Sequence, residues 1–528
     1  MGHVYMVTAS PCRRRRGSAP LFPLLLLLAL GLSGCSTIGR PRELPPDFRM
    51  LPAEAGRLQE FAAAGAATLE PEESGLLLLP GNRDALDWRL AMVDNARESI
   101  DAQYFLWDDD YTGRLMLKRL LWAADRGVQV RILVDDIFLT HSDRSIAALT
   151  NHPNMDIRIF NPNPSRRTRA GSVFRFMLEF RRLNRRMHNK LFIADGLVAI
   201  TGGRNIGDNY FGVSPDYNFR DLDVLVVGPV VDDMAQSFDD YWNSPYAFPG
   251  QKLHRRGTEE YLERVRERLE DDIARDPRRM VFPAEVSSWD HLLYYAPRDL
   301  VPGRVRFVAD HPVERQNREV VRSLTDLLNG NEGSVQEILI ITPYFIPDQG
   351  VLEIFHQLEQ DQVDVRLLVP SLASINHTAV HSHYRPHRET LLEKGVELFE
   401  YHHLPGGTGR LYADTAPFRA DFISMHLKAV VSGQRKTYVG SLNFDPRAMR
   451  INTENGLIID SRRFNEELRA IVEPMCGEDQ AWTVHLNPEG RGLIWTSFEG
   501  ERRSPPARGP VQRTGEFLAR FLPIANQL

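Results

Sequence analysis

Cysteine is scarce in this sequence: only Cys12, Cys35 and Cys476 occur among 528 residues. So few thiols cannot build a disulfide framework, and the hydrophobic core must hold the fold. The sequence also lacks a Walker loop and a dinucleotide fingerprint, so ATP, CTP and NAD are not implied and no cofactor is expected. These absences argue against disulfide scaffolds and nucleotide-dependent enzymes.

A positive net charge is lacking as well. The chain has 64 basic and 70 acidic residues, which gives a formal net charge of −6. Domains that bind nucleic acid are usually basic, so no nucleic-acid partner is expected. Hydrophobic residues make up 42% and charged residues 25%, as in ordinary globular proteins. The length favours about two domains.

Long hydrophobic runs are also absent. The apolar stretch Leu21–Leu32 is too short to span a bilayer comfortably, which takes roughly 20 residues. It follows the basic run Arg13–Arg16 and leads into Leu32-Ser33-Gly34-Cys35, which resembles the bacterial lipoprotein box. We therefore predict a signal peptide over 1–34 and lipidation at Cys35. The protein would be exported and anchored to a bacterial membrane facing the periplasm, with inner or outer membrane left open. The alternative is an uncleaved signal anchor.

Residues 35–74 contain several prolines and an alanine-rich stretch, which predicts a tether of mixed coil and helix. From Gly75 on, short strands alternate with helices of ten to fifteen residues, the order expected of an α/β fold. The first series has strands at Leu76–Leu79, Ile100–Leu106 and Val128–Val134, and helices at Ala85–Ala96 and Gly113–Asp125.

The same order recurs later in the chain. The second series has strands at Val305–Val308, Ile338–Phe345 and Val363–Val369, and helices at Arg318–Leu328 and Leu352–Glu359. We align the copies where Tyr104-Phe105 matches Tyr344-Phe345. This duplication predicts two repeats, 75–250 and 301–528, and a connector over 251–300 that contains the charged helix Glu259–Ala274.

Each repeat contains a His-x-Lys strand, a tight turn, and a glycine-led Asn. The first copy has Met187-His188-Asn189-Lys190 and Gly202-Gly203-Arg204-Asn205; the second has Met425-His426-Leu427-Lys428 and Gly440-Ser441-Leu442-Asn443. Asn205 follows His188 by 17 residues, and Asn443 follows His426 by the same 17. Because strand residues i and i+2 face the same side, each histidine shares a face with its lysine.

Two such hairpins facing each other would bring together two imidazoles, two ammonium groups and two carboxamides. This set suits a phosphodiester. One imidazole can attack phosphorus, the other can protonate the leaving oxygen, and the Lys and Asn side chains can stabilise the developing charge.

The pattern His-x-Lys-x4-Asp followed by Gly-Gly-x-Asn resembles the catalytic motif of the phospholipase D superfamily. The similarity extends over nearly all of 75–528. The stretches Arg186–Lys190, Gly202–Asp208 and Ser371–Ser374, with Tyr384 and Leu522-Pro523-Ile524, resemble bacterial cardiolipin synthases of the C type. The resemblance implies two α/β repeats packed about a pseudo-twofold axis, with one active site shared between them.

By this resemblance, His188 is the nucleophile and His426 the general acid, although the sequence alone cannot fix which does which. Asp221 and Glu454 would orient the imidazoles, with surface salt bridges as the alternative role. The full set predicted to be catalytic is His188, Lys190, Asp195, Asn205, Asp221, His426, Lys428, Asn443 and Glu454. Tyr104, Tyr344, Gly203 and Ser441 are predicted to contact substrate.

One position departs from the family pattern: the second motif has Gly433 where the first has Asp195. In the first copy Asp195-Gly196 is a turn dipeptide, and glycine serves a turn as well as aspartate does. We therefore expect an active enzyme.

Two further clusters have alternative interpretations. Eight arginines between Arg166 and Arg186, interleaved with aromatic and aliphatic residues, suit either an anionic lipid surface or a solvated helix. Six histidines between His377 and His403 resemble a metal cluster, but no Cys or tight carboxylate set accompanies them. No metal site is predicted.

The leading functional prediction is phosphatidyl transfer between phospholipids at a membrane surface, giving cardiolipin through a phosphohistidine. The alternatives are phospholipase D hydrolysis to phosphatidic acid, a nuclease, and a non-enzymatic lipid-binding role if Gly433 disables the second half. The donor phospholipid and the oligomeric state are left open.

Overall fold

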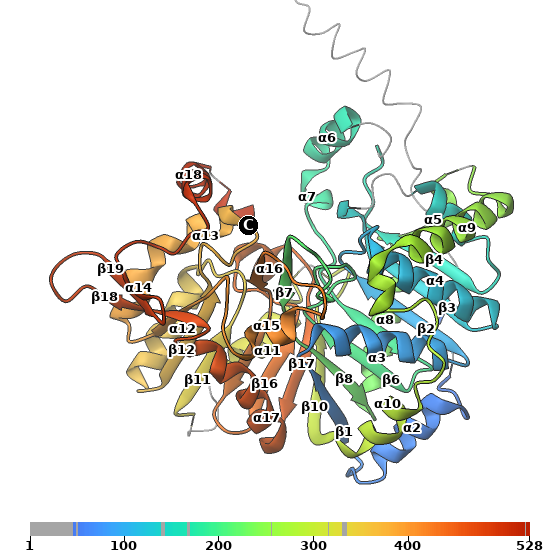
Figure 1. Cartoon of the computed structure of the whole chain (residues 1–528), viewed down its shortest axis with the longest axis horizontal. Helices are drawn as coiled ribbons and strands as arrows, with labels where there is room; N and C mark the ends of the chain where they lie inside the picture. The colour runs from blue at the N-terminus through green and yellow to red at the C-terminus, as the bar shows by residue number, and fades with distance from the viewer. Residues whose placement is uncertain are drawn as a thin grey trace, which may run out of the picture.

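The alternating strands and helices form two halves of similar order (Figure 1). The computed structural model describes residues 46–48 and 51–527, apart from 139–142, 166–168, 255, 315, 330–334 and 523. The first half contains strands β1 (Glu73–Leu79), β2 (Ser99–Tyr104), β3 (Gln129–Asp135), β4 (Met155–Phe160), β5 (Leu191–Ala194), β6 (Val198–Gly202), β7 (Tyr217–Arg220), β8 (Asp223–Val227) and β9 (Ala247–Pro249). Its helices are α2 (Arg57–Ala66), α3 (Asn82–Asn95), α4 (Tyr111–Asp125), α5 (Asp143–Leu149), α6 (Arg169–Leu178), α7 (Phe180–Leu183) and α8 (Val230–Trp242).

Helices α9 (Glu259–Arg275) and α10 (Asp290–Tyr295) lead to the second half. Its strands are β10 (Val301–Ala309), β11 (Glu337–Ile341), β12 (Asp364–Pro370), β13 (Glu397–Tyr401), β14 (Phe422–Met425), β15 (Ala429–Ser432), β16 (Lys436–Gly440), β17 (Asn455–Asp460), β18 (Ala481–Leu486), β19 (Leu493–Ser497) and β20 (Gly500–Arg502). Its helices are α11 (Glu319–Asn329), α12 (Gln349–Gln360), α13 (Thr378–Tyr384), α14 (Arg388–Glu393), α15 (Thr408–Ala413), α16 (Pro446–Arg450), α17 (Arg462–Val472) and α18 (Pro510–Ala519).

Eighteen of these strands pair into one continuous sheet that crosses both halves. The spatial order is β9-β4-β3-β2-β5-β6-β8-β1-β10-β17-β16-β15-β11-β12-β13-β18-β19-β20. The order read outward from the β1–β10 pair is the same in each half as far as β9 and β18. Because β1 and β10 are antiparallel, the halves are related by a pseudo-twofold axis, and the predicted α/β repeat fold is confirmed.

The sheet is mixed. In each half three neighbouring strands are parallel, as β2-β3-β4 and β11-β12-β13, and the hairpins that follow are antiparallel. The third strand of each set, β4 or β13, was not among the predicted strands. A shared hydrophobic core joins the halves, with Val226 and Met234 of the first packed in the same cluster as Leu457 and Leu468 of the second. The fold therefore ties the two motifs into one unit.

The pairing also corrects the alignment of the two repeats. Gln103 pairs with Leu191, and Ile341 pairs with Ala429, which lie 238 positions further along. The same offset relates His188 to His426, so Tyr104 corresponds to Thr342 rather than to Tyr344. The predicted match at Tyr-Phe was therefore shifted by two residues.

The N-terminal segment differs from the expectation in part. Helix α2 lies within the predicted tether, but it packs on the first half through Leu58 and Phe61, and Phe61 contacts Trp88 with ring centroids 5.4 Å apart. The predicted signal peptide and Cys35 lie outside the described residues. Among those that are described, no helix is long and apolar enough to cross a membrane.

Candidate active site

Two short parallel pairings set the site. Strand β14 pairs in parallel with β7, so Met425 lies opposite Arg220 and the next residues, His426 and Asp221, emerge side by side. An isolated parallel bridge between Met187 and Thr453 does the same for His188 and Glu454. Each histidine therefore meets a carboxylate of the other half. The sequence offered no sign of this crossing.

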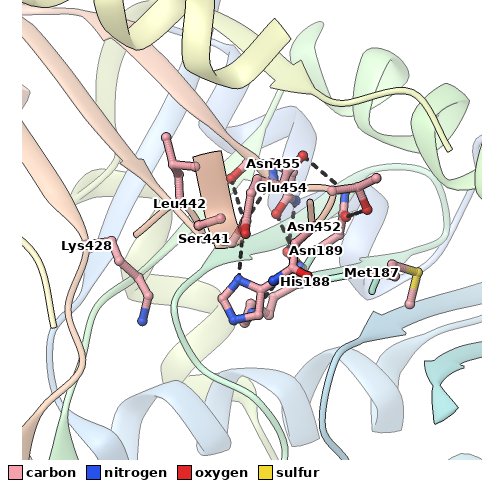
Figure 2. Close-up of polar contacts among 12 residues, drawn as sticks. Met187, His188, Asn189, Lys428, Ser441, Leu442, Asn452, Glu454 and Asn455 are labelled. Carbon is pink, nitrogen blue, oxygen red and sulfur yellow. Dashed lines mark hydrogen bonds and ion pairs between the residues drawn. The ribbon is translucent and has the colours of Figure 1, made fainter. Parts of the chain in front are cut away.

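The first of these pairs is His188 with Glu454. Nδ1 of His188 lies 2.8 Å from Oε2 of Glu454, and the hydroxyl of Ser441 donates to the same oxygen. Figure 2 shows the ring of His188 turned toward Glu454, with Lys428 of the second half beside it. Glu454 is fully buried, and this burial raises its pKa to about 8, although Lys190 opposes the shift. With Nδ1 committed to Glu454, Nε2 is left for chemistry.

The second pair is His426 with Asp221. Nδ1 of His426 lies 2.6 Å from Oδ2 of Asp221, and the amide of Leu222 donates to Oδ1 at 2.8 Å. Aromatic rings enclose the imidazole: the centroids of Phe219 and Tyr210 lie 4.7 and 5.5 Å from that of His426. These contacts fix the ring plane and direct Nε2 away from Asp221.

Gly203 and Ser441 occupy equivalent positions behind these carboxylates. A Cβ at Gly203 would lie 2.1 Å from Oδ1 of Asp221, so only glycine leaves room for that carboxylate. At Ser441 the side chain is instead used, as a donor to Glu454. Both positions were predicted to bind substrate. Both are buried, and their contacts support the carboxylates instead.

The two lysines sit close to the imidazoles. Nζ of Lys190 donates to the carbonyl of His188, and Nζ of Lys428 donates to that of His426, each at 2.5 Å. Burial lowers the pKa of Lys190 well below its ordinary value and that of Lys428 to about 8.

Burial and both lysines also hold the pKa of His188 and of His426 well below the usual range. This shift favours the neutral form of each imidazole, the form that a nucleophile requires. Since both lysines act on both histidines, the two motifs form one site.

The asparagines are not equivalent. Asn205 is engaged, accepting from the amide of Leu106 and donating to the hydroxyl of Tyr210. Oδ1 of Asn443 is buried and has no hydrogen-bond partner among the described residues. A buried polar atom without a partner is costly, and Asn443 thus keeps uncommitted an acceptor that Asn205 uses within the fold.

Asp195, predicted to be catalytic, lies in the turn between β5 and β6, at the opposite end of β5 from His188. Its carboxylate accepts from the amides of Arg97, Glu98 and Ser99. It adopts φ 55°, and Gly433 at the equivalent turn has the same φ of 55°. These contacts give Asp195 a structural role in the turn instead of the predicted catalytic one. The shared φ also explains why glycine can form the same turn at position 433.

Tyr104, predicted to contact substrate, points into the core of the first half. It is 1% exposed, and its hydroxyl accepts from Nε of the buried Arg89. Its neighbour Phe105 meets the site instead, with its ring centroid 4.9 Å from that of His188. Tyr344 does lie near the site, 6.4 Å from His426 by ring centroids.

Sequence reasoning missed Phe105, Tyr210 and Arg447. Arg447 donates to both the side-chain and the backbone oxygen of Asn184, and its charge contributes to the lowered pKa of His188. The position equivalent to Arg447 in the first half, 238 residues earlier, is Asn209. The internal repeat therefore gave no signal for this residue.

The histidines between 377 and 403 are spread over separate contacts. His381 lies 2.7 Å from Arg388, His402 lies 3.0 Å from Glu499, and His377 packs 5.7 Å from Tyr344 by ring centroids. Among the residues that the structure describes, no group of three or more His, Cys, Asp or Glu side chains is placed to hold a metal ion.

This chain is similar to several known proteins. A family model described as "Cardiolipin synthase, PLD-like domain" matches residues 90–242 and 326–476. Cardiolipin synthase C of Escherichia coli is 33% identical, over 86% of this chain and 96% of that protein. Cardiolipin synthase A of Pseudomonas putida is 26% identical, over 76% of this chain and 67% of that protein.

Among solved structures, phosphatidylserine synthase of Haemophilus influenzae superposes with a TM-score of 0.52 at 17% identity, over 77% of this chain and 85% of that one. This likeness concerns the fold alone. The duplicated family match and the extended identity to a cardiolipin synthase go further: the chain belongs to the phospholipase D-like family of cardiolipin synthases and is a phosphatidyltransferase of that family.

Proposed function

We propose that this enzyme makes cardiolipin by passing a phosphatidyl group from one phospholipid to phosphatidylglycerol through a phosphohistidine. The observation that carries the proposal is the crossed pair of imidazole–carboxylate contacts, His188 with Glu454 and His426 with Asp221. Two imidazoles with oriented Nδ1 atoms supply a nucleophile, His188 in its neutral form, and a proton carrier, His426 in its protonated form, for one phosphorus.

The chemistry needs no external oxidant or reductant. Nε2 of His188 attacks phosphorus, the bond from phosphorus to the head-group oxygen breaks, and protonated His426 gives its proton to that oxygen. His426 then takes the proton from a hydroxyl of phosphatidylglycerol. That oxygen attacks phosphorus, the bond from phosphorus to nitrogen breaks, and His188 is restored. The roles of the two histidines follow the family resemblance.

The local charges suit this sequence of steps. Lys190 and Lys428 are buried next to the imidazoles, and their ammonium groups face an anionic phosphodiester without competition from bulk water. The side-chain amide nitrogen of Asn443 can donate hydrogen bonds to phosphoryl oxygens. These groups can stabilise the charge that develops on the phosphoryl oxygens.

The deciding assay incubates purified protein with labelled phosphatidylglycerol, with and without phosphatidylethanolamine, and resolves the products by chromatography. Cardiolipin supports the proposal, and a yield that rises with phosphatidylethanolamine identifies that lipid as a donor. Phosphatidic acid as the sole product would show that the enzyme hydrolyses phospholipids and does not transfer the phosphatidyl group. DNA cleavage without any lipid product rejects the lipid chemistry.

Variants test the two-histidine scheme. We expect His188→Asn and His426→Asn each to abolish turnover, and Lys190→Ala and Lys428→Ala each to cost about 10²-fold or more. Excess EDTA should leave the rate unchanged, because side chains supply every role in the scheme. Inhibition by EDTA that zinc or magnesium reverses would instead point to metal catalysis.

We also propose that the protein is exported and anchored through a lipid on Cys35, facing the periplasm. The basic run, the short apolar stretch and the Leu-Ser-Gly-Cys tetrapeptide support this. Incorporation of a labelled fatty acid into the wild type but not into Cys35→Ala tests it. Equal labelling of both would reject this anchor.

A further inference from the structure

We propose that the protein carries a second membrane contact in its folded body, a docking surface for an anionic phospholipid bilayer. It is formed by residues 169–183, which include α6 and α7, and by residues 508–522 and 524–527, which include α18. We call these residues the rim. In Figure 1 the two parts project from the same side of the molecule, one from each half.

Helix α18 has an inverted pattern of burial. The face turned to the protein carries Glu516, which is 3% exposed and lies 2.9 Å from Arg520 and 3.3 Å from Arg385. The apolar side chains point outward: Val511 is 87%, Phe517 51% and Leu518 60% exposed. A helix that only completes a fold buries its apolar face, so this helix presents that face to something else.

The rim of the first half is similar. Val173, Met177, Leu178 and Phe180 are all exposed, with values between 40 and 63%. Each part also carries a pair of phenylalanines four residues apart whose rings are in contact. The pairs are Phe176 with Phe180 and Phe517 with Phe521, and the ring centroids are 5.4 Å apart in both. Exposed apolar residues gathered in this way mark a contact surface.

The rim borders the active site. Helix α18 packs on α13, which follows His377, and His377 contacts Tyr344 beside His426. On the other side Asn184, which directly follows α7, donates to Oε1 of Gln527 at 2.6 Å, and it also binds Arg447 near His188. The C-terminal end thus contacts the first part of the rim, and a short chain of contacts leads from each part to one of the two histidines.

The net positive charge of the rim indicates what binds to it. The rim contains seven arginines and two glutamates, whereas the whole chain has a net charge of −6. A second copy docked rim to rim would bring two surfaces of net positive charge together, which is unfavourable. An anionic bilayer attracts this charge and accepts the apolar side chains into its interface. The rim therefore suits a lipid surface and would hold the active site against it.

The test uses the full chain with Cys35→Ala, so that no acyl chain contributes, and measures its partition onto vesicles by flotation. One rim variant carries Met177→Ser and Leu178→Ser, and another carries Leu518→Ser and Phe521→Ser. The matched control carries Tyr294→Ser and Tyr295→Ser on α10, which are 64 and 47% exposed and lie on the opposite side in Figure 1. Vesicles contain either equal phosphatidylglycerol and phosphatidylcholine or phosphatidylcholine alone.

We expect each rim variant to bind the anionic vesicles about tenfold more weakly, the α10 control to bind as its parent does, and phosphatidylcholine vesicles to bind weakly throughout. Turnover of a short-chain phosphatidylglycerol below its micelle concentration should be unchanged in the rim variants. That last readout rests on the proposed function, while the binding readout does not. Vesicle binding by the rim without cardiolipin formation would leave this inference standing and reject only the function.

Two results would overturn the inference. One is equal binding by the parent and both rim variants, or an equal loss in the α10 control. The other is that the parent sediments as a dimer and the rim variants as monomers, while their binding to vesicles is unaffected. The melting temperature of every variant must match that of the parent, which is expected because all the substituted side chains are exposed.

Discussion

At the scale of single residues, we expect the carboxylate behind each histidine to control activity. We expect Asp221→Asn to lower kcat by about 10³ to 10⁴, because an amide can donate to Nδ1 of His426 and hold the wrong tautomer. The matched control is Asp195→Asn, since Asp195 is equally buried but bonds only backbone amides. It should lower the melting temperature and keep kcat within about twofold. Equal losses of kcat would reject the distinction.

The paired positions Gly203 and Ser441 give a second prediction. Gly203→Ser places a Cβ 2.1 Å from Oδ1 of Asp221, so that carboxylate must shift, and kcat should fall by about 10² or more. Ser441→Gly removes one donor to Glu454 and should cost only about tenfold. Steady-state kinetics of both variants check this. A larger loss of kcat for Ser441→Gly than for Gly203→Ser would contradict these roles of the two positions.

The raised pKa of Glu454 predicts how stability varies with pH. Its pKa is about 8 in the folded protein and 4.5 ordinarily, so the folded state holds a proton that the unfolded state has lost between these values. Stability from this group is present below pH 4.5 and is lost as the pH rises through 8.

Glu454→Gln removes this dependence. The melting temperature of the variant relative to the wild type should therefore rise between pH 5 and pH 9, by at least about 2 °C. Thermal unfolding at several pH values measures it. A difference that stays constant or falls over this range contradicts the assignment.

At the scale of elements, the turn after each His-x-Lys strand is structural. Gly433 and Asp195 share a φ of 55°, a region that aspartate tolerates and β-branched residues do not. We expect Gly433→Asp to leave kcat unchanged and not to lower the melting temperature, because the new carboxylate can bond the amides before β11 as Asp195 does before β2. Gly433→Val should lower the melting temperature. A large change in kcat for Gly433→Asp would show that this position affects catalysis.

Much of the fold and part of the site could be predicted from the sequence. The strands at 128–134 and 363–369 are apolar runs, and β3 and β12 occupy nearly the same residues. His188 and His426 stood out because equal spacing repeats in two copies. The pairing of Tyr104 with Tyr344 failed for a physical reason. A shift of two residues keeps every side chain on the same face of the sheet, so the hydrophobic pattern cannot reveal it.

The crossed carboxylates could not be foreseen. His188 and Glu454 are 266 positions apart, and their contact depends on the bridge between Met187 and Thr453. Asp195 was assigned from its place in the motif, but spacing does not tell which end of a strand faces the site. Phe105 and Arg447 carry no motif, so only their three-dimensional position identifies them.

At the scale of the whole molecule, the connector is not the sole link between the two halves. They share the antiparallel pair β1–β10 and one hydrophobic core. We therefore expect a chain divided between Ser287 and Ser288, both exposed, to regain at least about a tenth of the activity when the two fragments are produced together. Each fragment alone should be inactive, as measured by cardiolipin formation. Activity in either fragment alone would contradict a site shared between the halves.

The crossed contacts have a further consequence for how the enzyme comes into being. A half that has folded first carries a histidine whose orienting partner still lies in unfolded chain. It is therefore expected to do no chemistry on lipids during synthesis. Activity is all-or-none, since both imidazoles gain their partners in the same event, the docking of one half on the other. Only the fully assembled protein therefore has an active site in which both histidines are oriented.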